Sequence, residues 1–376
     1  MSIRPVWAEV DCSAIRDNAA ALCALVGPRT EVCAVVKAFA YGHGPVRAAQ
    51  AAIEGGATWL GVALVEEGEA VRRGGIEAPI LVLSEPRGTA MRRVVGSDLR
   101  PAIYTMAGVR AAAAAVEDLG QILPVHLKVD TGMHRVGASP EHALDVARAI
   151  AAEPGLELEG VWTHFAVADE VARRSFTDGQ AERLHEVVAA LAGEGIVPKM
   201  VHAANSAATL GHPSARLDLV RCGIALYGIA PSLELAPHAL AAGLRPALSL
   251  KAEVSFSKVV EAGEAMSYGL AYTAPERTTI ATVPIGYADG VPRRLGTNGG
   301  EVLVAGQRRP VAGAVTMDQL LVDCGPGAEV GPGDEVVLIG RQGAHEITAW
   351  EWAERTGTIA YEVVCGLSAR VPRVFV

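Results

Sequence analysis

The sequence predicts an α/β protein in which a closed (β/α)8 barrel of the TIM type is followed by a C-terminal, mostly β domain. Over about the first 245 residues, short β-branched runs alternate with Ala-rich amphipathic stretches, as in repeated βα units. Eight such runs favour a closed barrel and leave an open doubly wound sheet as the alternative. From about residue 246, strand-like runs follow one another with Gly and Pro turns, which indicates a β domain.

The expected barrel strands are rich in Val, Ile and Leu and cover residues 32–36, 58–64, 79–84, 100–104, 124–130, 158–164, 199–204 and 218–222. Helices are expected between them at 45–54, 65–74, 107–119, 140–152 and 170–194. Several begin at an Asp, Ser or Pro that can start a helix.

In the second region, strands are expected at 247–261, 278–285, 301–304, 309–315, 319–324, 334–339 and 369–376, with one short helix at 348–356. We therefore predict a barrel domain over residues 1–245 and a β domain over 246–376. The first strand residues of the chain are the part that could instead join the second domain.

Charge and cysteine usage exclude several classes of protein. The net charge is −9 and no basic run occurs, so nucleic acid and anionic membranes are poor partners. The N-terminal stretch "MSIRPVWAEVDCSAIRDN" has no apolar signal core, and no apolar run approaches the ~18 residues of a membrane span. Six scattered cysteines without a CxxC pair argue against disulfides and a metal site. A soluble, cytoplasmic protein without a metal is expected.

Lys37 is the first candidate for a catalytic residue. Only five of the 33 basic residues are lysines, and this one follows the apolar run "AVV" and precedes Tyr41 and Gly-His-Gly. A snorkelling lysine at a strand end is the ordinary interpretation. The scarcity of lysine favours instead a desolvated amine that forms a Schiff base with a carbonyl, either of a substrate or of pyridoxal phosphate.

Other polar residues follow the expected strands at the same end. In a barrel the C-terminal ends of the strands face the active-site mouth. Ser206 and Gly223 lie in the loops after strands seven and eight, where barrels usually hold a phosphate. The residues alone therefore predict a barrel enzyme with a Schiff-base lysine and a bound phosphate.

Several stretches, taken in order, resemble the signature blocks of the alanine racemase family over essentially the whole chain. They are "VVKAFAYGHG", "KVDTGMHRVG", "THFAVAD", "HAANSAAT", "RCGIALYG", "MSYGLAY", "PIGYADG", "AVTMDQ" and "YEVVCGLSARVPRVF". The resemblance implies a fold-type III pyridoxal phosphate enzyme that interconverts L- and D-alanine and supplies D-alanine for peptidoglycan precursors. It also implies a head-to-tail homodimer whose active sites each draw on both subunits.

The resemblance assigns catalytic roles. Lys37 resembles the lysine that holds the cofactor as an internal aldimine and acts as base for D-alanine, and Tyr268 resembles the opposite-face base from the partner subunit. Two bases suit a reaction that removes a proton from one face of Cα and returns it on the other. Arg221 resembles the arginine facing the pyridine nitrogen, and His164 the link from Arg221 to the tyrosine. Without the resemblance, Tyr268 and His164 are interpreted as a strand tyrosine and a core histidine.

The resemblance also assigns binding residues. Those matching the phosphate contacts are Tyr41, Ser206, Gly223, Ile224 and Tyr361, with Asn205 flanking them. Arg135 resembles the substrate-carboxylate arginine, whose forked guanidinium suits a carboxylate. Lys128 matches a lysine often found as N-carboxylysine. Met317 resembles a partner-chain residue whose backbone N–H meets that carboxylate, and Tyr287 and Asp318 match residues lining the site.

Three departures from the family pattern bear on substrate breadth and rate: Phe39 replaces the usual Asn or Asp, Thr316 a common Cys, and Ala369 an often aromatic residue. A broad-specificity or serine racemase on the same scaffold is thus the nearest alternative. A decarboxylase on a related barrel is disfavoured by "MSYG" and "VTMDQ". From other classes, the alternatives are a non-catalytic pyridoxal phosphate homeostasis protein, which the second domain argues against, and a structural protein.

Overall fold

The computed structural model describes residues 4–117 and 119–376. The chain forms two compact units. The first, here called the barrel unit, consists of residues 13–40 and 44–245. The second, here called the β unit, gathers the described residues up to Cys12, the short segment Tyr41–His43, and Pro246–Val376.

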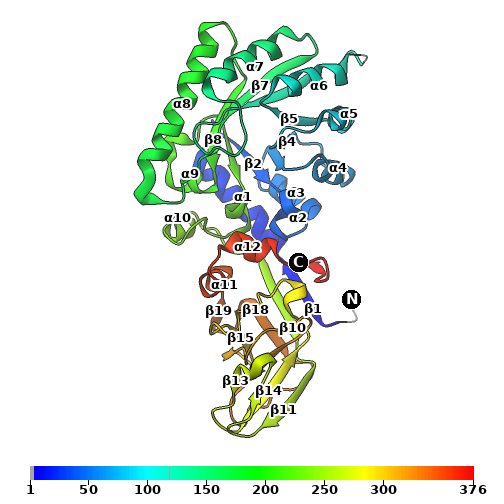
Figure 1. Ribbon diagram of the computed structural model, residues 1–376, viewed down its shortest axis with the longest axis vertical. Helices are drawn as coiled ribbons and strands as arrows, with labels where there is room; N and C mark the ends of the chain where they lie inside the picture. The colour runs from blue at the N-terminus through cyan, green and yellow to red at the C-terminus, as the bar shows by residue number, and fades with distance from the viewer. Residues whose placement is uncertain (1–3, 118) are drawn as a thin grey trace. The chain divides into compact units, whose positions relative to one another are not determined.

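Eight parallel strands close into a ring in the barrel unit, which confirms the predicted fold class (Figure 1). They are β2 (Glu31–Val35), β3 (Trp59–Val62), β4 (Ile80–Val82), β5 (Leu99–Ile103), β6 (Leu123–Lys128), β7 (Leu156–Trp162), β8 (Met200–Asn205) and β9 (Leu219–Cys222). The ring closes where β2 pairs with β9, with Cys33 opposite Arg221. Strands β3, β4 and β9 are buried along their whole length, as their continuous apolar sequences require.

Helices cover the outside of the ring (Figure 1). The helices of ten or more residues are α1 (Cys12–Val26), α3 (Pro45–Glu54), α6 (Met106–Val116), α7 (Pro140–Ala152) and α8 (Arg174–Gly193). The shorter ones are α4 (Val65–Arg73), α5 (Met91–Gly96), α9 (Ser206–Gly211) and α10 (Ala236–Ala241). The segment labelled α2 (Lys37–Tyr41) is a left-handed turn that follows β2. The predicted starts at Pro45 and Pro140 are confirmed, because proline fits the first turn of a helix and Ser139 caps α7. The predicted helix at 170–194 is instead a short 3-10 turn (Val171–Arg173) followed by α8.

The β unit contains three sheets. The largest has the order β16–β15–β18–β10–β1–β20, with β19 paired to β18. Its strands are β1 (Val6–Val10), β10 (Leu248–Glu253), β15 (Glu301–Val304), β16 (Gln307–Pro310), β18 (Glu335–Gln342), β19 (His345–Ile347) and β20 (Arg373–Phe375). The others are β11–β14–β17 (Phe256–Val260, Thr278–Val283, Leu320–Asp323) and the ribbon β12–β13 (Ala265–Met266, Tyr272–Thr273). Thus β1, at the start of the chain, lies between β10 and β20.

Three strand predictions in this unit are wrong in extent. The run 309–315 is a strand only at its start, because β16 ends at Pro310 and Val311 forms just an isolated bridge to Val322. The run 247–261 is two strands, because the chain changes sheets at residues 254 and 255: Val254 N–H donates to Asp334 in one sheet and Ser255 N–H to Thr282 in the other. The run 369–376 is ordered as a strand only from Arg373, since carbonyls of the preceding turn accept bonds from the Arg373 guanidinium instead of from a neighbouring strand.

Two helices complete the β unit, α11 (Ala349–Thr356) and α12 (Ala360–Cys365). The first is the predicted short helix. Thr348 and Glu351 form a capping box at its start, and Gly357 ends it in the left-handed conformation (φ 68°) that glycine tolerates. The six-residue α12 is absent from the sequence-based prediction, because so short a segment carries little helical periodicity.

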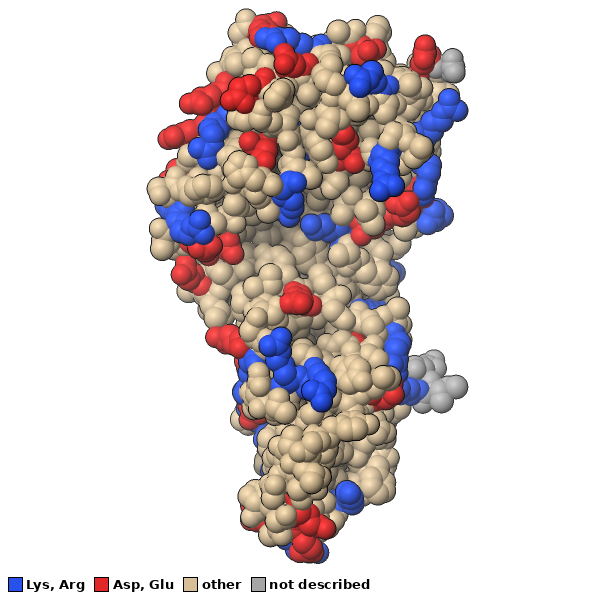
Figure 2. Space-filling model, in the orientation of Figure 1, with Lys and Arg blue, Asp and Glu red and all other residues tan. Residues whose placement is uncertain are grey.

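Charges of both signs are interspersed over the face shown in Figure 2. In the part of the chain that the structure describes, no helix combines the length and apolarity needed to cross a membrane.

Candidate active site

Lys37 lies two residues beyond the end of β2 and begins an unusual turn. Residues 38–41 all have positive φ, between 52° and 56°, so the chain winds there as a left-handed helical turn. This conformation costs L-residues roughly 1–2 kcal/mol each. Such strain persists only where surrounding contacts hold it, and it concentrates at functional sites.

Four basic side chains lie near one another at the mouth of the barrel unit: Lys37, Lys128, Arg135 and Arg221. Lys128 ends β6 and is buried, with its Nζ 4.5 Å from the centre of the Trp162 ring. Burial, and then the charges of Arg135, Arg221 and Lys37, lower the pKa of Lys128 to about 7. A large fraction of this amine is therefore neutral at physiological pH.

Arg221 is buried at the end of β9 and its guanidinium makes several hydrogen bonds. Its Nη2 donates to the carbonyls of Thr163 (2.8 Å) and Ala203 (2.9 Å) and lies 3.4 Å from His164 Nδ1. Burial lowers the pKa of Arg221 to about 10, so it stays cationic at neutral pH. Burial and then the Arg221 charge hold the pKa of His164 well below its usual value, which keeps this imidazole neutral.

A buried histidine chain behind Arg221 was not predicted from the sequence. Arg221 Nη1 donates to His202 Nδ1 (2.8 Å), His202 Nε2 lies 3.0 Å from His126 Nδ1, and His126 Nε2 lies 3.2 Å from Glu159 Oε2. Arginine only donates, so His202 Nδ1 is an acceptor and each ring carries its proton on Nε2. Burial lowers the pKa of both imidazoles, in agreement with these neutral tautomers.

The sequence pattern does not single out these histidines, because His126 and His202 lie within β6 and β8 and not at the strand ends. Space for the histidine chain comes from Gly160 on β7, where a Cβ atom would collide with the His126 ring. The Trp162 ring stacks on His202 at 5.5 Å with an interplanar angle of 7°. Two histidines inside the apolar strands on either side of β7 were the available signal.

The loops after β8 and β9 meet as expected from their positions in the barrel. Ser206 Oγ accepts hydrogen bonds from the backbone N–H groups of Gly223 (2.9 Å) and Ala225 (3.3 Å). Ile224 is buried between them. Asn205 caps α9, its Oδ1 accepting from Ala208 N–H at 3.0 Å. This cluster of a hydroxyl and backbone N–H groups is chemically suited to a phosphate.

The remaining barrel residue, Arg135, is exposed in the loop after β6. Asp130 organises this loop by accepting the N–H groups of Gly132 and His134, both at 3.0 Å. The charge of Arg135 lowers the pKa of Lys128 and His164, which places it in the same electrostatic cluster.

The other predicted residues belong to the β unit. Tyr287 N–H donates to Thr316 O (2.9 Å) and Ala288 N–H to Met317 O (3.1 Å), so Tyr287 and the Met317–Asp318 pair lie on adjoining loops. The Tyr268 side chain is 71% exposed in a short 3-10 turn. The ring of Tyr41 lies 6.2 Å from that of Tyr361.

Asp289 is a further residue that was not predicted from the sequence. Its carboxylate is fully buried and accepts two bonds from Arg4, at 2.7 and 3.0 Å, and one from Gly286 N–H at 3.0 Å. Arg370 lies 3.3 Å from the same carboxylate and donates to Asp318 at 2.6 Å. Asp289 therefore anchors the loop that carries Tyr287.

Comparison with known proteins agrees with this geometry. Residues 10–231 match the family described as "Alanine racemase, N-terminal domain", and residues 247–375 match "Alanine racemase, C-terminal domain". The chain belongs to the alanine racemase family. The alanine racemase of Symbiobacterium thermophilum is 48% identical over 99% of this chain and 97% of its own length.

Solved structures of the alanine racemase family share the whole fold. That of the enzyme from D-cycloserine-producing Streptomyces lavendulae matches with a TM-score of 0.94 and 41% identity, covering 100% of this chain and 98% of that one. A histidine racemase from Leuconostoc mesenteroides also matches, with a TM-score of 0.89 and 32% identity over 100% of this chain and 99% of its own. The scaffold thus carries racemases named for different amino acids.

Proposed function

We propose that the protein interconverts L- and D-alanine with pyridoxal phosphate and supplies D-alanine for peptidoglycan precursors. The proposal rests on the grouping of Lys37 with the buried Arg221, in a chain that is similar over its full length to alanine racemases. Lys37 and Arg221 both act electrostatically on Lys128 and His164, so the four side chains share one site in the barrel unit.

The residues present fit the cofactor. Lys37 would hold its aldehyde carbon, Arg221 would face its ring nitrogen, and the cluster of Ser206, Gly223 and Ile224 would receive its phosphate. The flanking residue is Asn205, and the further phosphate contacts proposed from the family pattern are Tyr41 and Tyr361. When bound, pyridoxal phosphate draws electrons from the substrate Cα and so makes its hydrogen acidic.

The chain's own residues then move the proton. We assign the D-alanine face to the Lys37 amine and the L-alanine face to the Tyr268 phenol of the partner subunit, because racemisation needs a base on each face. His164 Nδ1 is 3.4 Å from Arg221 Nη2 and the imidazole is neutral. It can therefore accept a hydrogen bond from Arg221 and donate one to the tyrosine. Arg135 binds the substrate carboxylate, helped by the backbone N–H of Met317 of the partner subunit, with Tyr287 and Asp318 lining the site.

We also propose that Lys128 is N-carboxylated. Carbon dioxide reacts with the neutral amine, forming an N–C bond and releasing the amine proton to water. The lowered pKa of Lys128, about 7, supplies that neutral amine. The product is an anion that can pair with Arg135.

The deciding experiment is an absorbance spectrum of the purified protein with pyridoxal phosphate, followed by L-alanine and a coupled assay for D-alanine. We expect a yellow protein that makes D-alanine. Lys37→Ala should lose both properties, since no amine remains to hold the cofactor. A yellow Lys37→Ala protein would show that another residue holds it.

A second candidate is a racemase of broader specificity on the same scaffold. It is favoured by the similarity to the histidine racemase and by the substitutions Phe39 and Thr316. Turnover of alanine, serine, histidine, lysine and arginine by the same preparation separates the two. A preference of less than about tenfold for alanine, or about 1.4 kcal/mol, would favour the second candidate.

A further inference from the structure

We propose that Glu67 is a positioning residue for Lys37, acting through the left-handed turn that follows the lysine. Glu67 lies in the first turn of α4, the helix that follows β3. Its Oε1 accepts the N–H of Ala38 at 2.6 Å, and its Oε2 accepts the N–H groups of Ala63 (2.8 Å) and Leu64 (3.1 Å). One half-buried carboxylate therefore joins the residue next to Lys37 to the neighbouring strand end. The inference rests on the role proposed for Lys37.

The turn needs such a partner. Four consecutive residues with positive φ are unfavourable for L-amino acids, and only contacts from outside the turn can hold them there. Ala38 is the first of the four, so fixing its N–H sets the direction in which the chain leaves Lys37. A carboxylate is a strong acceptor for this purpose, since hydrogen bonds to an ionised group are shorter and stronger than neutral ones.

The link also ties Lys37 to the barrel itself. Strands β2 and β3 pair in parallel, with Val35 opposite Gly61, and Val36 N–H donates to Gly61 O at 2.8 Å. The Glu67 bonds continue this pairing beyond the ends of both strands. Lys37 is thus held against β3 by a backbone bond on one side and the carboxylate bond on the other.

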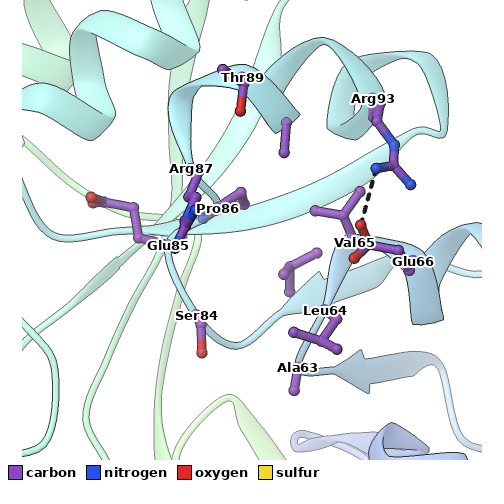
Figure 3. Close-up of a pocket in the computed structure, with 12 residues that line it drawn as sticks. Ala63, Leu64, Val65, Glu66, Ser84, Glu85, Pro86, Arg87, Thr89 and Arg93 are labelled. Carbon is purple, nitrogen blue, oxygen red and sulfur yellow. Dashed lines mark hydrogen bonds and ion pairs between the residues drawn. The ribbon is translucent and has the colours of Figure 1, made fainter.

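Glu67→Gln tests the bond to Ala38 selectively. The amide retains one oxygen, which can keep the two bonds that cap α4, but its NH2 group then faces the Ala38 N–H, donor against donor. The matched control is Glu66→Gln, which removes the same charge from the same helical turn. Glu66 instead pairs with Arg93 at 3.0 Å and lines a cavity of about 420 Å³ between the loops after β3 and β4 (Figure 3).

The first readout is the rate at which full-length protein freed of cofactor captures pyridoxal phosphate covalently. We expect Glu67→Gln to slow capture about 10- to 100-fold, the effect of losing a hydrogen bond to a charged group. Glu66→Gln should stay within about twofold of the unsubstituted protein, as a surface ion pair contributes little. Equal capture rates for the two variants would overturn the inference. Failure of the unsubstituted protein to capture the cofactor would instead overturn the role of Lys37, and this inference with it.

Two further measurements complement the capture rate. The first does not depend on the rate of cofactor capture, and the second does not depend on whether Glu67→Gln folds. In Glu67→Gln, the primary deuterium isotope effect should rise for α-deuterated D-alanine and not for L-alanine, because Lys37 serves the D face. In the unsubstituted protein, hydrogen exchange at the Ala38 amide should be strongly slowed. Exchange there as fast as at an exposed loop amide would overturn the inference even if Glu67→Gln does not fold.

Discussion

At the scale of single residues, Lys128 illustrates how burial changes an ordinary side chain. A lysine amine normally has a pKa of 10.5, whereas burial and three neighbouring cations bring that of Lys128 to about 7. Between these two values the unfolded chain holds a proton that the folded chain lacks. Stability therefore rises with pH over this range, because the unfolded state binds more protons.

We predict that Lys128→Met is more stable than the parent protein at pH 7, and that this advantage shrinks as the pH rises toward 10. Denaturant unfolding at several pH values in buffer free of carbon dioxide measures the difference. A gap that is constant across this range would show that the Lys128 pKa is not lowered.

N-carboxylation of the same residue is a second prediction at this scale. Protein equilibrated with isotopically labelled carbon dioxide should show one labelled carbamate signal by NMR, and Lys128→Met should lack it. The signal should fade as the pH falls below about 7, since protonation of the amine removes the reacting form. A parent spectrum without the signal would contradict the proposal.

At the scale of elements, the left-handed turn after β2 makes a prediction with an unusual sign. Ala38 is exposed with a φ of 52°, a conformation that costs alanine but not glycine. Ala38→Gly should therefore raise the free energy of unfolding by roughly 0.5–1 kcal/mol, even after the greater entropy of glycine in the unfolded chain is counted.

The control for this prediction is Ala189→Gly, at an exposed position inside helix α8. There glycine should lower the free energy of unfolding by about 1 kcal/mol. Urea unfolding of the two variants should shift the midpoint in opposite directions. A shift in the same direction would mean that the turn is not strained.

At the scale of the whole molecule, Tyr268 connects function to assembly. Its side chain is 71% exposed in the single chain, which suits a residue offered to a second copy. If each site combines Lys37 of one subunit with Tyr268 of the other, a dimer of one Lys37→Ala chain and one Tyr268→Phe chain has one intact site and one doubly altered site.

We predict that mixing the two inactive variants under conditions that exchange subunits restores activity. Random exchange gives about half mixed dimers, each with one intact site, and hence about a quarter of the parent activity. Each variant subjected to the same exchange by itself serves as the control. No recovery would indicate that both bases come from one chain.

Sequence patterns predicted the barrel strands because most of these strands are largely buried and their sequences are short apolar runs. The positions of the strand ends were equally predictable, because parallel strands in a ring direct their C-terminal ends to one mouth. Lys37, Lys128 and Arg221 were placed in one group for this reason. Specific roles for these residues came from family resemblance, not from the pattern alone.

Residue types and their order along the chain were therefore enough for the fold class and the family, and they led to the proposal of Lys37 as the reactive lysine. Only the tertiary structure decided which groups surround them: the histidine chain behind Arg221, the Asp289 anchor, and Glu67 on the turn after Lys37. Each joins residues from separate elements, and no local periodicity records such a pairing. The lowered pKa of Lys128 has the same origin, because burial and neighbouring charge belong to the folded chain and not to the lysine itself.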